Sequence, residues 1–181
     1  MISNGSYTAS LFKQLKKCSN IDRVIIHIFN TKGIYLKPKE VAGDGLCLYH
    51  CCLYFVETFD LKYNDIQPQT AQELKTFLLS YVDDHKQEKI SKQINLPCKE
   101  ILQGKPIKSI VNNNSFWGCD LTLNLFCRLF RFDALLYSID ASGRIDFVPQ
   151  QPSPVDLEGE VTPSGYIVCD RSIHFTVLEP L

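Results

Sequence analysis

The sequence contains no long apolar segment and no excess of charge of either sign. Its 181 residues include no apolar run near the roughly 20 residues that a membrane-spanning helix needs. The first residues, Met1-Ile2-Ser3-Asn4-Gly5, lack the basic region and the apolar core of a secretory signal. Lys and Arg number 19 and Asp and Glu number 20, so the strongly basic surface typical of proteins that bind nucleic acids or anionic membranes is not expected. We therefore expect a cytoplasmic protein that binds neither membranes nor nucleic acids.

The cysteines lack the spacing of a zinc site or of a disulfide framework. The chain has eight, but no two are separated by the two residues that a zinc-binding pair usually shows. Cys47, His50 and Cys51 lie close together, yet no second ligand pair stands at a finger-like distance. Cys51 and Cys52 are adjacent, and most other cysteines sit in apolar patterns. We expect reduced thiols, no metal and no cofactor.

The remaining composition suits one globular domain spanning residues 1–181, with 45% hydrophobic and 22% charged residues and no internal repeat. Runs rich in β-branched and aromatic residues at 24–29 and 34–36 predict an N-terminal β-hairpin around a Gly-containing loop. Prolines and glycines predict a surface loop over residues 149–165. Apolar periodicity predicts helices at 6–17, 47–59, 70–82, 97–103 and 120–131, with Thr70 and Asp120 as N-caps. Residues 83–95 form a charged segment. Further strands are predicted at 134–139, 144–148, 166–169 and 173–178. The fold class is α+β, with helices flanking a central, mostly antiparallel sheet.

One short stretch, Gly43-Asp44-Gly45-Leu46-Cys47, has the pattern of a reactive thiol site. Its glycines and aspartate predict a tight turn, and Cys47 stands where the apolar helix begins. The first N–H groups of a helix lack intrahelical partners and carry partial positive charge, which favours a thiolate and can stabilise an oxyanion. A buried cysteine after an ordinary turn is the alternative, and this stretch alone does not separate the two.

A cysteine nucleophile needs a base, which is most often histidine because its pKa lies near neutrality. His50 projects from the helix that Cys47 begins, His85 falls in a charged segment, and His27 lies within a predicted strand. His174 lies on the last apolar strand, where an imidazole has no evident reason to be unless it is paired. His174 is the candidate base that this pattern offers, but taken alone it is better explained as a satisfied core or edge histidine.

Three motifs in order resemble those of the ovarian tumour (OTU) family of cysteine proteases. Asp44-Gly45-Leu46-Cys47-Leu48-Tyr49 resembles the family's Asp-Gly-Asn-Cys-aromatic signature, Trp117-Gly118 resembles its central Trp-Gly segment, and His174-Phe175 resembles its His-aromatic motif. The resemblance covers residues 40–178. It implies a papain-like OTU fold, and the predicted N-terminal hairpin resembles extra strands of some viral members, which suggests a viral or other pathogen-encoded protein acting in the host cytosol.

The resemblance also implies a role for each motif residue. Cys47 would be the nucleophile and His174 the general base, which later donates a proton to the leaving lysine amine. Asp44 would hold the turn by hydrogen bonds. The backbone of Gly45 and Leu46 would help Cys47 to form an oxyanion hole.

Other motif residues are expected to shape the site or to tune it. Trp117 and Phe175 would wall the channel for a Gly-Gly tail, with core packing as the alternative for Trp117. Leu46 stands where the family usually has asparagine. Thr176 stands where many members have Asp or Asn, so either Thr176 or Asp170 is a possible third member, and a Cys–His dyad is the other possibility.

The function that this resemblance implies is deubiquitination: hydrolysis of isopeptide bonds after the Gly-Gly end of ubiquitin or a ubiquitin-like modifier. Its partners would be ubiquitin and polyubiquitin chains, and we expect a monomer. Two alternatives stay open. One is a catalytically weak OTU-like module that binds ubiquitin, and the other is a viral polyprotein protease that uses the same site.

Overall fold

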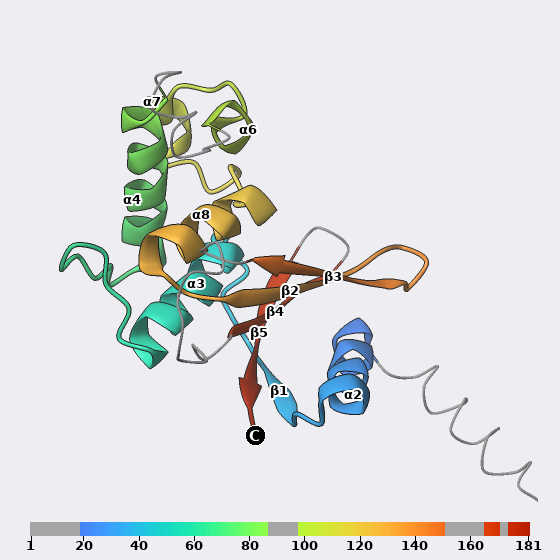
Figure 1. Cartoon of the computed structure of the whole chain (residues 1–181). Coiled ribbons are helices and arrows are strands. Elements are labelled where there is room, and N and C mark those ends of the chain that lie inside the picture. Colours follow the sequence, from blue (N-terminus) through green and yellow to red (C-terminus); the bar gives the residue numbers. More distant parts are fainter. Residues whose placement is uncertain (1–18, 87–97, 151–164, 171–173) are drawn as a thin grey trace, which may run out of the picture.

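The computed structural model describes residues 19–86, 98–150, 165–170 and 174–181 (Figure 1). The predicted helix at 6–17 and most of the segments 83–95 and 149–165 lie outside these ranges. The helices are α2 (Asn20–Lys32), α3 (Cys47–Thr58), α4 (Ala71–Asp84), α6 (Cys98–Leu102), α7 (Ile107–Ile110) and α8 (Asp120–Phe130), and the strands are β1 (Leu36–Lys39), β2 (Ala134–Ile139), β3 (Ile145–Gln150), β4 (Gly165–Asp170) and β5 (His174–Pro180).

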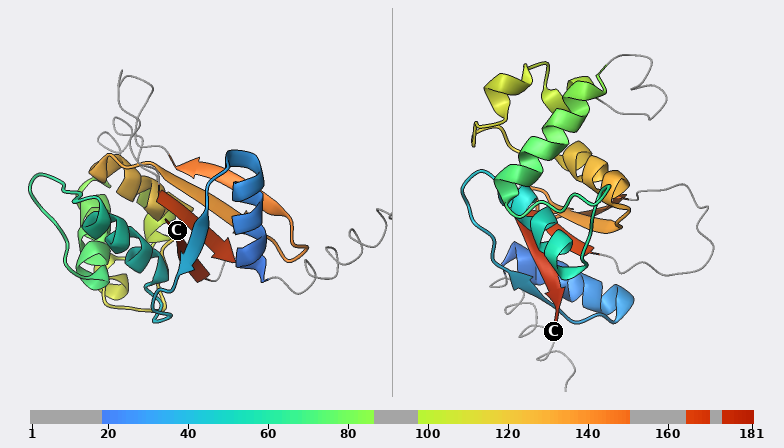
Figure 2. Two further views of the ribbon diagram at one scale, coloured as in Figure 1. Left: turned by 90° about the horizontal axis from the view of Figure 1, so that it is seen from below. Right: turned by 90° about the vertical axis from the view of Figure 1, so that its left-hand side faces the viewer.

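The strands form one five-stranded sheet in the order β1-β5-β4-β2-β3. β2 pairs with β4 in parallel, and the three other pairs are antiparallel, which confirms the α+β class and the mostly antiparallel sheet. Helices cover both faces: α3, α4 and α8 lie on one side, and α2 lies on the other (Figures 1 and 2). Among the described helices, the sheet therefore separates a large helical layer from α2.

The predicted N-terminal hairpin is wrong, because its first strand is part of helix α2. Ser19 caps this helix through a reciprocal capping box with Asp22, and Gly33 ends it in the left-handed conformation, with φ of 68°. The β-branched run around Val24 favours a strand by propensity, but the inward side chains Val24 and Ile28 are four residues apart, as on one face of a helix. The hairpin was the basis for expecting a pathogen protein, and that basis is removed.

Two hydrophobic cores hold the sheet between its helices. The larger one joins α3, α4 and α8 to one face of the sheet and contains Leu48, Phe55, Phe126 and Val177 among many others. The smaller one, under α2, includes Leu178. α3 is buried on most sides, as its apolar sequence predicts, so it is fixed against the sheet by hydrophobic burial.

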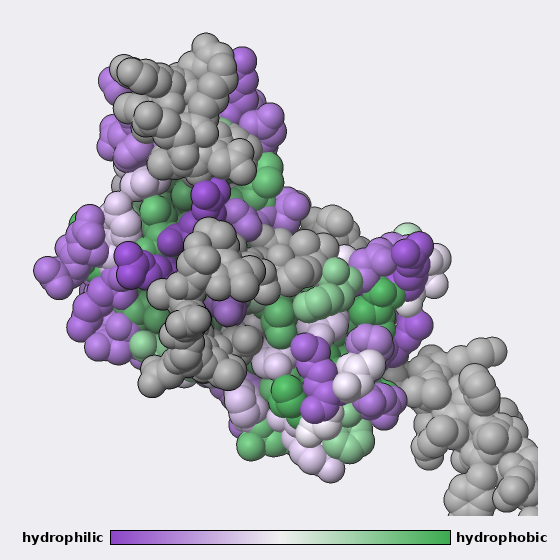
Figure 3. All heavy atoms as spheres, viewed as in Figure 1, coloured by the Kyte–Doolittle hydropathy of each residue, from purple (hydrophilic) through white to green (hydrophobic). Residues whose placement is uncertain are grey.

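The outer surface mixes hydrophilic and hydrophobic residues on the face seen in Figure 3. Large hydrophobic side chains that remain exposed include Tyr35 and Trp117. Within the described residues, no helix combines the length and the apolar character needed to span a membrane.

The capping box of α2 generates a test of the corrected assignment. Ser19→Ala removes the side-chain acceptor of the Asp22 N–H and should lower the free energy of unfolding by about 1 kcal/mol, measured by urea denaturation. Ser115→Ala is the control, because the described residues include no partner for the Ser115 hydroxyl. Equal stability of the two variants would contradict a capped helix beginning at Asn20.

Candidate active site

The turn before α3 depends on glycine at position 45. Gly45 has φ of 85°, a left-handed conformation that side chains with a Cβ rarely adopt. A Cβ at this position would also collide with the backbone carbonyl of Asn114. The neighbouring Gly43 has open space around it. Gly45 therefore lets the turn pass directly beneath the segment around Asn114.

Asp44 ties this turn together with both oxygens of its carboxylate. The Leu46 N–H donates to Oδ1 at 3.0 Å, and Nε2 of His50 lies 3.0 Å from Oδ2. The hydrogen bond from His50 is the main cause that holds the pKa of Asp44 below its usual value. Burial acts in the opposite direction, and the Leu46 backbone N–H adds a smaller lowering. The Leu46 N–H, which we expected to face an oxyanion, is thus engaged inside the turn.

Cys47 is the first residue of α3, as predicted, and the helix end around it is open. The preceding residue, Leu46, is the N-cap but supplies no side-chain cap. The first backbone hydrogen bond runs from the His50 N–H to the Leu46 carbonyl at 2.9 Å. Among the described residues, the N–H groups of Cys47, Leu48 and Tyr49 find no acceptor, so their partial positive charge stays available beside the thiol.

α3 and β5 run side by side in the same direction. The Tyr54 hydroxyl, late in α3, donates to the Glu179 carboxylate, late in β5, at 3.0 Å. Earlier in α3, burial raises the pKa of the Cys51 thiol well above its usual value, and the nearby thiols, including that of Cys169, raise it further. Cys169 pairs with Phe175 across β4 and β5. The Tyr54–Glu179 bond joins the later parts of α3 and β5, so the two starts lie toward the other end of the pair.

This alignment brings Cys47 and His174 to one end of the α3–β5 pair. Cys47 precedes Cys51 by one turn, about 6 Å along the helix axis. His174 precedes Phe175 by one residue, about 3.4 Å along the strand. The two candidate catalytic residues are therefore the first residues of two neighbouring elements, and no hydrogen bond joins them in the described part of the chain.

His174 shares its side of β5 with the two candidates for a third member. Side chains alternate along a strand, so His174, Thr176 and Leu178 face the side that α2 covers. Thr176 is buried there. Asp170 lies directly opposite His174 in the β4–β5 register and accepts a hydrogen bond of 2.9 Å from the Asn20 amide at the start of α2. Asp170 is thus the cross-strand neighbour of His174.

The two aromatic residues expected to line a channel differ in exposure. Trp117 is 49% exposed, next to Gly118, where a Cβ would press on the Leu48 side chain one residue beyond Cys47. Phe175 is 8% exposed and belongs to the larger core. Trp117 is therefore half exposed, whereas Phe175 is packed in the core. Cys119 is the N-cap of α8, the helix that follows Trp117. The predicted N-cap, Asp120, is instead the first residue of the helix.

The other histidines each contact a neighbouring group, and Cys52 is a buried core thiol. Nδ1 of His85 lies 2.7 Å from the Tyr81 carbonyl, and the two rings stack at 4.0 Å. His27, on α2, meets the edge of the Tyr137 ring. Burial raises the pKa of the Cys52 thiol well above its usual value, which is typical of an unreactive core cysteine. His50 binds Asp44, an interaction that the sequence analysis did not identify.

The segment that covers the turn is held by a buried lysine, also missed from the sequence. Lys75 is fully buried in α4 and donates to the Asn113 carbonyl at 2.7 Å. Its amine lies 5.9 Å from the Tyr49 ring centre and 5.8 Å from that of Phe116, and burial lowers its pKa. Gln72 supports the same segment through the Val111 carbonyl at 2.8 Å. These bonds fix the backbone that Gly45 approaches.

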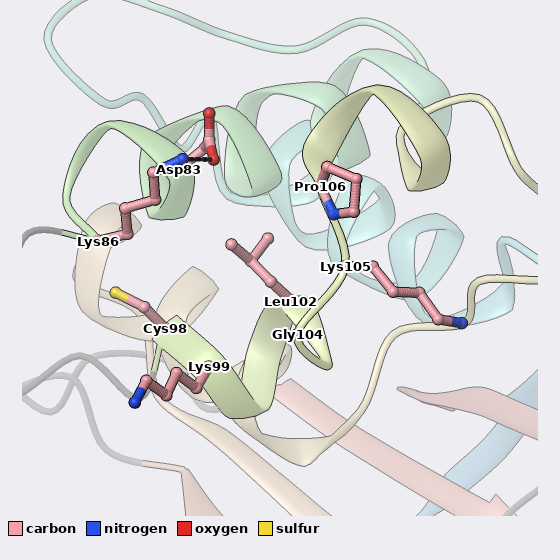
Figure 4. Close-up of a pocket in the computed structure, with 8 residues that line it drawn as sticks. All are labelled: Asp83, Lys86, Cys98, Lys99, Leu102, Gly104, Lys105 and Pro106. Carbon is pink, nitrogen blue, oxygen red and sulfur yellow. Dashed lines mark hydrogen bonds and ion pairs between the residues drawn. The ribbon is translucent and has the colours of Figure 1, made fainter.

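A pocket of about 410 Å³ lies elsewhere, between the end of α4 and the α6–α7 region (Figure 4). Its charged residues include Lys86, which is paired with Asp83 at 2.8 Å. Its only thiol, Cys98, donates to the His85 carbonyl at 3.5 Å, and burial raises its pKa. The lining residues are Asp83, Lys86, Cys98, Lys99, Leu102, Gly104, Lys105 and Pro106. The pocket contains no candidate nucleophile–base pair, and no group of His, Cys, Asp and Glu in the described ranges could hold a metal ion.

The turn geometry predicts different costs for two neighbouring glycines. Gly45→Ala forces a left-handed φ on a side chain and a clash with the Asn114 carbonyl, so the free energy of unfolding should fall by about 2 kcal/mol or more. Gly43→Ala should change it by less than about 0.5 kcal/mol, because nothing lies within 4 Å of the added Cβ. Urea denaturation of both variants measures this, and equal effects would contradict the close approach.

Comparison with solved structures identifies the fold. No protein-family model and no curated protein matches the chain. Among solved structures, the OTU domain of OTUD1 is similar with a TM-score of 0.55 and 12% identity, covering 88% of this chain and 94% of that one. An OTU deubiquitinase from Wolbachia pipientis wMel bound to ubiquitin gives 0.52 and 12%, covering 80% and 96%. The viral OTU domain protease from Farallon virus gives 0.51 and 14%, covering 81% and 85%. The chain therefore has the fold of an OTU domain.

Proposed function

We propose that this protein is a cysteine protease that hydrolyses isopeptide bonds after the Gly-Gly end of ubiquitin or a ubiquitin-like modifier. The observation that supports the proposal is the position of Cys47 at a helix N-terminus without a side-chain cap, in a chain with the OTU fold whose last strand begins at His174. A neighbour of the same fold is described in complex with ubiquitin, which supports ubiquitin as the partner. The proposed unit is a single domain that acts as a monomer on ubiquitin or its chains in the cytoplasm.

The reaction would proceed by nucleophilic catalysis. His174 takes the proton of the Cys47 thiol, and the thiolate attacks the carbonyl carbon of the terminal glycine. The resulting oxyanion accepts hydrogen bonds from the Cys47 N–H and the Gly45 N–H, since the Leu46 N–H is bound to Asp44. The C–N bond then breaks, and the lysine amine leaves with the proton from His174. Water hydrolyses the thioester and restores the thiol.

The pairing of Cys47 with His174 requires a particular orientation of the imidazole. Alternation along β5 assigns His174 to the side of Asp170, not to the side of α3. His174 is the first residue of the strand, so its ring lies at the end of the sheet and can turn toward the start of α3. The proposal places the ring there, with Trp117 beside the tail of the modifier.

A second candidate function is a ubiquitin-binding module with weak catalysis. Leu46 and Thr176 favour it, because each stands where OTU proteases usually have a polar side chain that supports the site. Leu46 is buried in the larger core and offers no hydrogen bond from its side chain. Intact Cys47 and His174 favour catalysis.

The first functional test is capture of a ubiquitin probe that carries a C-terminal electrophile. Wild-type protein should form a covalent adduct, and Cys47→Ala should form none, because Cys47 is the proposed nucleophile. Cys119→Ala is the matched control, since Cys119 is more exposed and follows Gly118. An adduct that persists in Cys47→Ala would contradict the proposal. Tight binding without an adduct would favour the binding module.

The second test concerns the residue that supports His174. Asp170 carries a carboxylate and faces His174 across the sheet, where paired Cβ atoms lie about 5 Å apart. Thr176 has only a hydroxyl, which stabilises an imidazolium less. Turnover of a fluorogenic ubiquitin substrate should fall only about twofold in Thr176→Ala and further in Asp170→Asn. A loss in Thr176→Ala as large as that in His174→Ala would contradict this assignment.

A further inference from the structure

Both backbone polar groups of Leu46, the residue before the candidate nucleophile, form hydrogen bonds. The Leu46 N–H donates to Asp44 Oδ1, and the Leu46 carbonyl accepts from the His50 N–H. The His50 ring, in turn, contacts Asp44 Oδ2 at 3.0 Å. Asp44, Leu46 and His50 thus form a closed set of three hydrogen bonds, here named the 44–46–50 clamp. Cys47 is the next residue along the chain.

The direction of the His50 bond follows from chemistry. An ionised carboxylate only accepts hydrogen bonds, so Nε2 of His50 carries the hydrogen and donates it to Asp44. Because His50 belongs to α3, its bond fastens the preceding turn to the helix itself. Without it, the Asp44 carboxylate would be held only by the Leu46 N–H and could rotate.

We propose that His50 is a positioning residue of this site, which orients the peptide groups around Cys47 by fixing the Asp44 carboxylate. The inference rests on the proposed function of Cys47, and it adds a residue that touches neither the substrate nor the thiol. The peptide groups in question are those that carry the Gly45 and Cys47 N–H groups, which would face the oxyanion, while the Leu46 N–H stays bound to Asp44. A small rotation of this turn would move those donors away from the reacting carbonyl.

The exposure of His50 and Asp44 predicts that their bond affects catalysis more than the stability of the fold. The His50 side chain is 27% exposed and that of Asp44 is 45% exposed. Pairs this exposed contribute little to the free energy of unfolding, because water competes for both groups. Loss of the His50 bond should therefore lower kcat while leaving the unfolding midpoint and KM nearly unchanged.

Two uncharged substitutions of His50 make the test specific. The side-chain amide of His50→Gln has its nitrogen as many bonds from Cα as Nε2 of histidine, so it can donate to Asp44. The amide nitrogen of His50→Asn corresponds to Nδ1 and falls short. With a fluorogenic ubiquitin substrate, His50→Asn should lose at least about tenfold in kcat, and His50→Gln should stay within about threefold of wild type. His27→Ala, on the far side of the sheet, is the control and should retain full activity.

The Leu46 amide provides a readout that does not depend on catalysis. Its hydrogen exchange should be faster in His50→Asn than in wild type and slow again in His50→Gln, because the clamp holds this N–H. Equal kcat and equal Leu46 exchange in the two variants would overturn the inference. If wild type cleaves neither ubiquitin nor a ubiquitin-like modifier, the proposed protease function is wrong, and the exchange rates alone then decide whether His50 holds the turn.

Discussion

Burial of α3 against the sheet is the constraint on which the candidate site depends. The helix is apolar on most sides and is covered by α4, α8 and one face of the sheet, so it has little freedom to shift. Its parallel run along β5 aligns the two starts, and Cys47 and His174 are the first residues of these elements. The position of the thiol is thus determined by hydrophobic packing of the whole helix, Cys47 included.

Polar interactions then shape the end of this helix. Asp44 and His50 bind the turn from below, while Lys75 and Gln72 hold the segment around Asn113 above it. Leu46, which replaces a polar residue of the OTU signature, is buried in the larger core. Its side chain therefore stabilises the turn by packing, and the hydrogen bonds come from its backbone. Burial of the Leu46 side chain explains this departure from the signature, and Leu46 supplies no side-chain cap to the helix N-terminus.

Most of the architecture followed from apolar periodicity. The helix expected at 47–59 and the strand at 134–139 are where the pattern placed them, because burial and period agree there. The pattern failed at α2, whose β-branched residues favour a strand locally while capping by Ser19 and packing on the sheet favour a helix. Local propensity loses to tertiary contacts in such a segment.

The site was predictable only in part, for a similar reason. Cys47 and Asp44 could be found because the glycine turn and the apolar helix are adjacent in sequence. Other features of the site depend on contacts between segments far apart in the chain, which periodicity cannot relate. These are the pairing of Asp170 with His174, the burial of Phe175 and the bond from Lys75 to Asn113. The His50 bond is local, but its direction depends on how the turn folds back onto α3.

The central claim is that Cys47 and His174 act together, and a crystal structure of the Cys47 adduct with a ubiquitin electrophile tests it most directly. The account predicts a His174 ring nitrogen within about 4 Å of the Cys47 sulfur and the modifier tail beside Trp117. A His174 ring turned toward α2, away from the sulfur, would contradict it.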